Sequence, residues 1–219
     1  MSFGPIVVIN PNSNEAVTLG LDDALQDFRF PGGPGIECLT LAEGPFGIES
    51  QLQSDQVILP LVRLVESRAD ASALVIACYS DPGIDACRAA TSAPVFGIQE
   101  SGLLTAMARG DRVGVIALAV PSIVRHRRYM RRMGVLDRIV GELPLDMTVD
   151  ETARGNRTFE RLTAVGNQLI GDGADAIVLG CAGMARHRQP LEHELGVPVI
   201  EPTQAAVAMA LGAVLAGSA

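Results

Sequence analysis

The sequence contains no lysine and no tryptophan, and all 17 of its basic residues are arginine. Without lysine, the chain cannot form the Schiff base that holds pyridoxal phosphate in enzymes, and it cannot supply the lysine of a phosphate-binding loop. We therefore expect chemistry that depends on neither group.

Positive charge is also scarce overall. The 17 arginines are set against 25 acidic residues, which gives a formal net charge of −8 at pH 7. This balance does not favour binding to nucleic acid or to an anionic membrane surface. The longest strongly apolar tract, residues 205–217, is shorter than the roughly 18 residues that span a bilayer, and it predicts a buried helix. We expect the partner to be a small-molecule substrate.

The four cysteines, Cys38, Cys78, Cys87 and Cys181, form no Cys-x-x-Cys pair. That spacing does not indicate a zinc knuckle or a thioredoxin-type motif, so we predict no metal site. The first ten residues lack the basic segment of a secretory signal. These features predict a cytoplasmic protein whose thiols stay reduced.

Short apolar runs alternate along the chain with segments of helical periodicity. Strands are expected at residues 6–9, 36–41, 74–77 and 95–98, and helices at 15–28, 51–67 and 85–90. Strands that are apolar on both faces and alternate with helices indicate a parallel sheet covered by helices. The fold class is therefore predicted to be α/β.

The second half of the chain repeats the first. The segment ALVIAC at residues 73–78 returns in the second half as AIVLGC at residues 176–181. We infer two α/β lobes of similar topology, residues 1–97 and 98–204, with a C-terminal helix at 205–219 that packs back on the first lobe. Because no glycine- or proline-rich linker separates the lobes, they should share a substantial interface.

In each lobe a cysteine directly follows a buried strand. Ligands of open α/β proteins bind at the carboxyl edge of the sheet, so facing lobes would place Cys78 and Cys181 on opposite walls of one cleft. The Ser-Asp-Pro-Gly sequence after Cys78 predicts a helix start, whose dipole would favour a thiolate. Small residues around Cys181 leave backbone N–H groups free for an enolate. One thiolate would remove a proton and the other thiol would return one, as in a two-base racemase without a cofactor.

The motifs ACYSDPG, LGCAGM, INPNSN and GPFGIES resemble those of the aspartate/glutamate/hydantoin racemase superfamily over nearly the whole chain. The branch that the chain is most similar to is that of the hydantoin and allantoin racemases. The resemblance implies two pseudo-symmetric flavodoxin-like lobes, racemisation without a cofactor and an active site in the cleft between the lobes. It also implies that Cys78 and Cys181 are the two catalytic cysteines.

The residues beside the cysteines differ from those of the amino-acid racemases in this superfamily. There, Asn-Thr follows the first cysteine and Thr the second, whereas this chain has Tyr79-Ser80 and Ala182-Gly183. These residues suit a neutral ring with amide edges, such as a 5-substituted hydantoin or allantoin, better than a zwitterion. Where the hydantoin racemases carry threonines, this chain has the apolar residues 117–120, so we expect the substrate contacts there to differ.

Several further residues are predicted to contact the substrate: Asn12, Phe46, Gly47, Tyr79, Ser80, Asp81, Ala182 and Gly183. Asn12 ends the first strand at the ligand edge, and Phe46 with Gly47 would line the pocket beside the 5-substituent. Backbone N–H groups near the cysteines would hold the ring carbonyls. The arginines between residues 125 and 132 are predicted to form a solvated helix face or a subunit contact.

Other functions fit the same sequence pattern. A cysteine-dependent cis-trans isomerase, similar to maleate isomerase, would use one thiol as a nucleophile, and an amino-acid racemase would use both thiols. A two-lobed binding protein without catalysis would have thiols of ordinary pKa. Small enzymes of this kind commonly form symmetric assemblies, so a homo-oligomer is expected.

Overall fold

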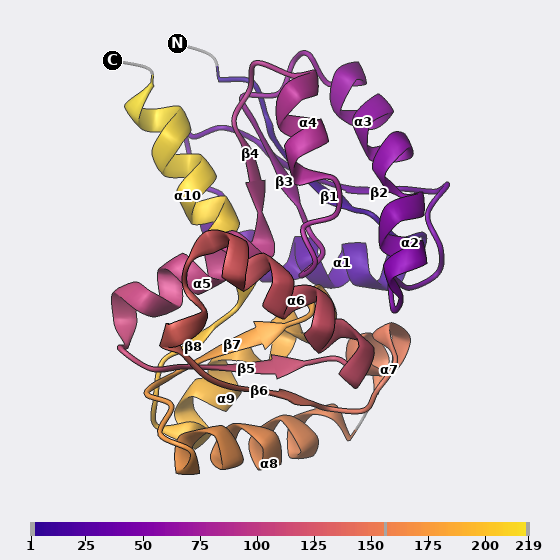
Figure 1. Ribbon diagram of the computed structural model, residues 1–219. Helices are drawn as coiled ribbons and strands as arrows, with labels where there is room; N and C mark the ends of the chain where they lie inside the picture. Colours follow the sequence, from indigo (N-terminus) through magenta and orange to yellow (C-terminus); the bar gives the residue numbers. More distant parts are fainter. Residues whose placement is uncertain (1–2, 156, 218–219) are drawn as a thin grey trace.

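The computed structural model describes residues 3–155 and 157–217. Two parallel four-stranded sheets lie in two lobes, one above the other in Figure 1. The strand order is β2-β1-β3-β4 in the first sheet and β6-β5-β7-β8 in the second. This equivalent order confirms the predicted α/β fold of two pseudo-symmetric lobes.

The first lobe has central strands that are completely buried. Its strands are β1 (Ile6–Asn10), β2 (Ile36–Thr40), β3 (Ala73–Ile76) and β4 (Val95–Gly97). Its helices are α1 (Glu15–Ala24), α2 (Gln51–Gln56), α3 (Ile58–Ser67) and α4 (Ile84–Ala90), with the short 3-10 helix η1 (Gln26–Phe28). Every residue of β1 and β3 is buried, as parallel strands covered on both faces require.

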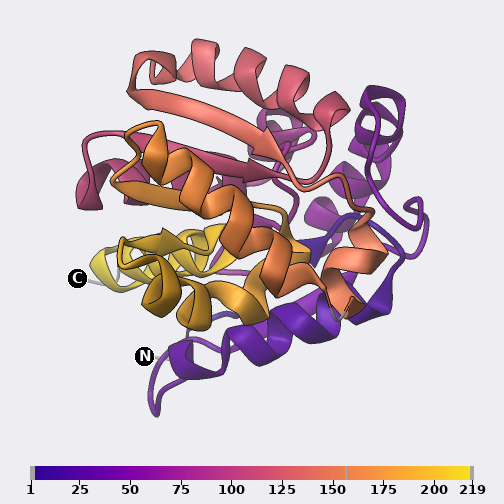
Figure 2. The same cartoon turned by 90° about the horizontal axis from the view of Figure 1, so that it is seen from below.

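The second lobe repeats this arrangement with longer helices. Its strands are β5 (Val113–Ala117), β6 (Ile139–Pro144), β7 (Ala176–Gly180) and β8 (Val199–Ile200). The helices after β4 are α5 (Ile98–Arg109), α6 (Val120–Met133), α7 (Val149–Arg154), α8 (Thr158–Gly171), α9 (Arg188–Leu195) and α10 (Pro202–Ala216), with the 3-10 helices η2 (Leu136–Arg138) and η3 (Ala182–His187). Figure 2 shows α6 on one side of the second sheet and α8 on the other, and both contact β5 and β6.

Two predicted helices are shorter than expected. The helix predicted at residues 15–28 ends at Ala24 and is followed by η1. The helix predicted at residues 51–67 divides at Val57 into α2 and α3. Pro60 lies in the first turn of α3 and has no N–H to bond a carbonyl of α2, so the two helices cannot be continuous there.

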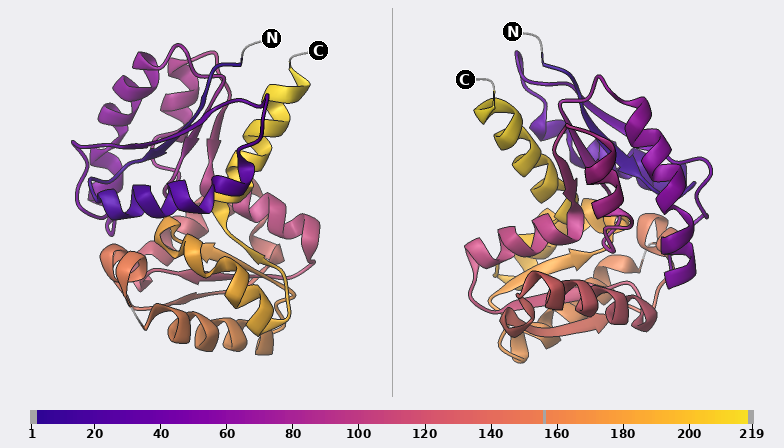
Figure 3. Two further views of the ribbon diagram at one scale, coloured as in Figure 1. Left: turned by 180° about the vertical axis from the view of Figure 1, so that it is seen from behind. Right: turned by 45° about the horizontal axis from the view of Figure 1, so that its top comes forward.

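Helices α5 and α10 pack against each other and join the lobes. α5 contacts β4 of the first sheet and β7 and β8 of the second, while α10 contacts β1, β3 and β4. Figure 3 shows α10, in yellow, beside the first lobe. A Cβ atom at Gly102 would lie 2.9 Å from Cβ of Pro202, so a glycine is needed for this close approach. Because α5 touches both sheets, the division at residues 97 and 98 stays a proposal.

The apolar C-terminal tract forms α10, which begins at Pro202, and the last two residues of the predicted helix at 205–219 lie outside the described residues. In the described parts of the chain, no helix is both long and apolar enough to cross a membrane.

Buried carboxyl groups cap the two helices that join the lobes. Asp81 accepts hydrogen bonds of 2.9 Å from two backbone N–H groups at the start of α5. Glu201 accepts from the N–H groups of Thr203 at 3.0 Å and Gln204 at 2.6 Å. Burial raises the pKa of each carboxyl group to about 7, although these hydrogen bonds lower it in part. The interface between the lobes therefore contains two groups that titrate near neutral pH.

Asp81→Asn and Glu201→Gln should each make the free energy of unfolding less dependent on pH. The pKa of each carboxyl group is higher in the folded than in the unfolded protein, so its stabilising contribution is present at low pH. This contribution is lost as the pH rises from about 4 to about 7, by up to about 1.4 kcal/mol per pH unit. Urea denaturation between these pH values measures the slopes, with the exposed Glu194→Gln as control. Equal slopes for all four proteins would contradict the prediction.

Candidate active site

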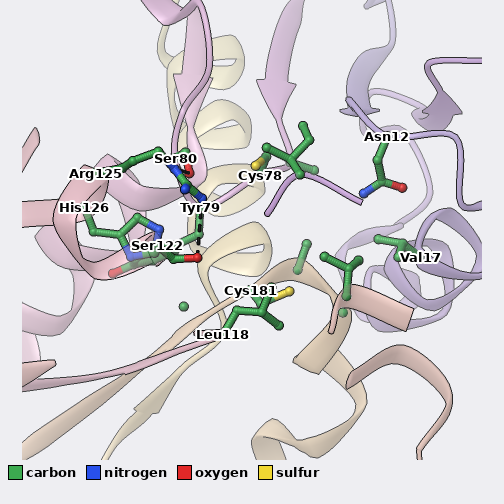
Figure 4. Close-up of a pocket in the computed structure, with 16 residues that line it drawn as sticks. Asn12, Val17, Cys78, Tyr79, Ser80, Leu118, Ser122, Arg125, His126 and Cys181 are labelled. Carbon is green, nitrogen blue, oxygen red and sulfur yellow. Dashed lines mark hydrogen bonds between the residues drawn. The ribbon is translucent and has the colours of Figure 1, made fainter. Parts of the chain in front are cut away.

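A narrow cavity lies between the lobes, where the carboxyl ends of the strands meet (Figure 4). Both lobes contribute to its lining, which consists of Asn12, Val17, Ile48, Ala77, Cys78, Tyr79, Ser80, Leu118, Ser122, Arg125, His126, Val149, Gly180, Cys181, Ala182 and Gly183. The cavity has the position that the sequence repeat predicts for a ligand site. Beside the two cysteines, eight residues are predicted to touch a substrate, and six of them lie in a turn that follows a strand. Five of the eight line the cavity: Asn12, Tyr79, Ser80, Ala182 and Gly183.

The two predicted cysteines lie on opposite sides of this cavity (Figure 4). Cys78 follows β3 and Cys181 follows β7, which are equivalent strands of the two sheets. The backbone N–H of Ser80 donates a hydrogen bond to the sulfur of Cys78, and that of Gly183 donates to the sulfur of Cys181. Two equivalent turns therefore hold one thiol each by the N–H group two residues further on.

Burial keeps both thiols protonated near neutral pH. It raises the pKa of Cys78 to about 11, and it also raises the pKa of Cys181. The backbone N–H groups, and Arg125 in the case of Cys78, lower the pKa only in part. The sequence predicted a thiolate at a helix start, which is wrong for the resting protein. α4 begins only at Ile84, well beyond Cys78, and the loss of solvation outweighs the hydrogen bonds.

Thr152 of α7 stands beside the second cysteine. Its buried hydroxyl donates to the carbonyl of Val149 at 2.8 Å and lies 3.8 Å from Sγ of Cys181. Rotation of this hydroxyl would let it donate to a Cys181 thiolate. A Cβ atom at Gly183 would lie 2.9 Å from Oγ1 of Thr152, so the glycine lets α7 approach the cysteine turn. No motif of the sequence pointed to Thr152, because it comes from a helix remote from LGCAGM.

Asn12 is held in one orientation at the other side of the cavity. Its Oδ1 accepts from Nδ2 of Asn10 at 3.1 Å and from the backbone N–H of Asn14 at 2.9 Å. The oxygen is thereby occupied, and Figure 4 shows the amide nitrogen directed toward the cavity. Asn12 can therefore donate a hydrogen bond to a carbonyl oxygen of a ligand.

Three predicted contacts, Phe46, Gly47 and Asp81, are not part of the cavity lining. Phe46 is 58% exposed, and Gly47 lies against Val149. The N–H of Asp81 donates to the carbonyl of Cys78 at 2.9 Å, and its carboxyl group caps α5. This N–H is therefore already bonded within the protein, and Asp81 fixes the turn that carries Cys78.

One face of α6 lines the cavity, whereas the sequence predicted a solvated face or a subunit contact for all the arginines of this helix. Ser122, Arg125 and His126 are buried and line the cavity, whereas Arg127, Arg128, Arg131 and Arg132 are exposed as expected. A hydrogen bond joins Nδ1 of His126 to the carboxylate of Glu142 in β6. The ring of Tyr79 packs edge-on against His126, with 4.9 Å between the ring centroids. The spacing of Ser122, Arg125 and His126 along one helix face was the only available signal.

This set of groups suits proton transfer on a carbon acid. Thiols on opposite sides of a flat ligand can exchange a proton with either face. Amide, hydroxyl and guanidinium donors around them can hold carbonyl oxygens whose charge grows during the reaction. Among residues 3–155 and 157–217, no three His, Cys, Asp or Glu side chains are placed to hold a metal ion.

Comparison with known proteins gives similarities that cover both lobes. A family model described as Asp/Glu/Hydantoin racemase matches residues 6–210. A hydantoin racemase of Paenarthrobacter aurescens is 34% identical over 223 residues, covering 97% of this chain and 92% of its own length. A hydantoin racemase of Pseudomonas sp. strain NS671 is 32% identical, covering 94% and 84%. The solved structure of an allantoin racemase from Klebsiella pneumoniae has a TM-score of 0.90 at 28% identity, covering 98% of this chain and 89% of its own.

Cys78 should react slowly with iodoacetamide at neutral pH. With a pKa of about 11 instead of 9.0, its thiolate fraction, and hence its alkylation rate, should be roughly 100-fold below that of an ordinary thiol. The rate should rise as the pH approaches 11. Peptide mass spectrometry measures each cysteine separately, and Cys78→Ser is the control for peptide assignment. A rate that is constant between pH 6 and pH 9, on the order of that of a free thiolate, would contradict the prediction.

Proposed function

The chain belongs to the Asp/Glu/hydantoin racemase family, and we propose that it racemises a 5-substituted hydantoin or a related cyclic ureide such as allantoin. The enzyme is an isomerase of the racemase type. The observation that carries the proposal is the pair of partly buried thiols, Cys78 and Cys181, on equivalent turns at opposite sides of one cavity. The names of the relatives and of the solved structure support a cyclic ureide as substrate.

Racemisation proceeds by transfer of two protons at C5. The thiolate of one cysteine removes the C5 proton, and the electron pair of the C–H bond moves into the adjacent carbonyl as an enolate. The thiol of the other cysteine then delivers its proton to the opposite face of C5. The product is the other enantiomer, and the two sulfurs have exchanged protonation states. The reaction needs no oxidant and no cofactor.

The raised pKa values match this chemistry. A thiolate whose parent thiol has a high pKa is a strong base, which suits a weak carbon acid. The thiolate of Cys78 is stabilised by the N–H of Ser80 and the charge of Arg125, and that of Cys181 by the N–H of Gly183 and the hydroxyl of Thr152. Each sulfur can therefore take both roles.

The ring is held mainly by backbone and amide groups. Asn12 donates to one carbonyl oxygen, and Ser80 lies beside the first thiol. Ala182 and Gly183 have small side chains or none, so the ring can approach the backbone there. Leu118 lines the cavity at the end of β5, and the ring meets an apolar surface there. This agrees with the expectation that contacts from residues 117–120 differ from those of the family's threonines.

We also propose a cytoplasmic location and a homo-oligomeric state, as the sequence predicts. Exposed apolar side chains on the surface support an assembly; among them are Leu52 and Leu59, which are 66% and 70% exposed. Light scattering after size-exclusion chromatography measures the molar mass in solution. A mass equal to that of one 23.0 kDa chain would contradict this part of the proposal.

The substrate class is tested with single enantiomers of 5-substituted hydantoins and of allantoin in deuterated buffer. We expect optical rotation to decay to zero while deuterium replaces the proton on C5, because in each turnover a solvent-exchanged thiol delivers a deuteron. Polarimetry and the C5 proton signal in NMR spectra follow the two processes together. No exchange on any of these rings by the folded, reduced protein would overturn the proposed function.

Cys78→Ser and Cys181→Ser should each reduce racemisation by about 10³-fold or more, because a serine hydroxyl is far too weak an acid to replace a thiol. The fold should persist, since a hydroxyl occupies nearly the same space as the thiol. Polarimetry measures the loss, and circular dichroism checks the fold. Cys87→Ser, a buried cysteine of α4 outside the cavity, is the matched control. Undiminished racemisation with full deuterium exchange in Cys181→Ser would refute the scheme with two bases.

A further inference from the structure

A buried arginine without a carboxylate partner lies in the cavity wall. Arg125 is 9% exposed. Its guanidinium donates at 3.3 Å to the carbonyls of Glu49 and Pro121, at 3.3 Å to the hydroxyl of Ser122 and at 3.4 Å to that of Ser80. All four partners are neutral. None of the ion pairs within 4.0 Å in residues 3–155 and 157–217 includes Arg125.

These four hydrogen bonds do not neutralise the charge. They are longer than the roughly 2.9–3.0 Å of a typical N–H···O bond, so they are weak. Removing a guanidinium from water is costly unless an anion compensates it, and the burial of Arg125 lowers its pKa. By contrast, arginines at the surface of this protein do pair with carboxylates, for example Arg63 with Glu43 at 2.7 Å. The cavity thus contains a positive charge that no carboxylate of the described residues pairs with directly; only Asp55 acts on it, from beyond ion-pair distance.

The same arginine connects the cavity to an outer hollow. Arg125 also lines this hollow, together with Gln51, Ser54, Asp55, Ser80, Arg128, Tyr129 and Arg132. Arg125, Arg128 and Arg132 lie on one face of α6 and form a row that leads from the surface to the cavity. Asp55 is the one acidic residue of this lining, and no ion pair within 4.0 Å joins it to Arg125, although its charge raises the Arg125 pKa in part. Arg132 pairs with Asp85 at 2.8 Å, so in this protein of net charge −8 the positive potential that attracts anions comes from Arg125 and Arg128.

We propose that Arg125 binds a carboxylate on the 5-substituent of the substrate, so that the preferred substrates are hydantoins with an acidic side chain. This inference rests on the proposed racemase function. A planar guanidinium can donate two parallel hydrogen bonds to a carboxylate. These two bonds would replace weak bonds that Arg125 now donates to neutral groups. The ligand supplies the counterion that the protein lacks.

The geometry places this subsite within reach of C5. The N–H of Ser80 bonds to the sulfur of Cys78, and the hydroxyl of Ser80 accepts from Nε of Arg125. One residue thus bridges the thiol that acts on C5 and the guanidinium. Figure 4 shows Arg125, Ser80 and Ser122 on one side of the two cysteines and Asn12 on the other. The ring carbonyls face Asn12, and a short substituent on C5 extends toward Arg125.

The charge of Arg125 also stabilises the Cys78 thiolate, so loss of activity in a variant would not by itself identify the carboxylate subsite. A pair of substrates that differ only in charge separates the two effects. An acid and its carboxamide have the same ring and nearly the same size. Stabilisation of the thiolate acts equally on both compounds, whereas binding of the carboxylate acts on the acid alone. The ratio of their kcat/KM values therefore reports on the subsite.

The test uses 5-carboxymethylhydantoin and 5-(2-carboxyethyl)hydantoin with the two corresponding carboxamides. Deuterium entry at C5 gives kcat/KM, and each value is divided by the exchange rate in buffer alone, which corrects for the intrinsic acidity of C5. We expect the wild-type protein to prefer the acid of at least one pair by about tenfold or more. Arg125→Gln should bring this ratio close to one, and Arg125→Lys should retain part of it, since it keeps the charge but not the planar fork.

Arg127→Gln is the matched control, because Arg127 is an exposed arginine of the same helix that lines neither the cavity nor the outer hollow. It should keep the wild-type ratio. A wild-type ratio of one or below, or a ratio that Arg125→Gln leaves unchanged, would overturn the inference. If Arg125→Gln does not fold, the wild-type protein still decides: a ratio of one or below for both acid–amide pairs would overturn the inference.

The outcomes also separate this inference from the proposed function. Exchange at C5 of neutral hydantoins or allantoin, without a preference for the acids, leaves the racemase intact and removes only the carboxylate subsite. No exchange with any of these rings removes the proposed function, and the inference falls with it.

Discussion

The whole arrangement depends on burying two thiols at one point between two sheets. Each thiol is partly buried, and each receives one backbone N–H from the residue two positions further along its turn. This requires a strand that ends at the cavity, a turn of small or polar residues after it and a second lobe that covers it. The repeated unit supplies an equivalent strand end and turn in each sheet. The packing of α5 against α10 joins the two lobes, so that each lobe covers the turn of the other.

Burial also creates the difficulty that the surroundings must solve. It raises the pKa of both thiols, so each thiolate is a strong base, but only a small fraction of each thiol is ionised near neutral pH. The protein offsets this with a different group on each side: the guanidinium of Arg125 near Cys78, and the hydroxyl of Thr152 near Cys181. A binding protein without catalysis would not need two desolvated thiols in one cavity. The placement of the two thiols on equivalent turns of one cavity therefore agrees better with the racemase than with that alternative.

The sequence predicted those parts of the structure that depend on local pattern. Continuous apolar runs revealed the buried strands, and the repeated segment around Cys78 and Cys181 revealed equivalent turns at a sheet edge. Thr152, Arg125 and His126 were missed because their positions depend on how α6 and α7 pack, and no local pattern encodes that. Phe46 and Asp81 were predicted as substrate contacts because they neighbour important segments, but neither lines the cavity: the first is exposed, and the second has its N–H bonded to the carbonyl of Cys78 and its carboxyl group capping α5.

The two lobes are alike in backbone and unlike in the side chains they bring to the cavity. Racemisation requires similar groups on both sides of the substrate, because each enantiomer must meet a base on one face and an acid on the other. Recognition of a substituent asks for the opposite, since the substituent leaves the ring on one side only. In this protein the symmetric part is carried by the strand ends and their N–H groups, which the repeat duplicates. The asymmetric part lies in α6, which lines the cavity with the polar side chains of Ser122, Arg125 and His126, whereas the equivalent helix of the first lobe, α1, contributes the apolar Val17. Side chains of this one helix can thus differ without any change in the two turns that hold the thiols.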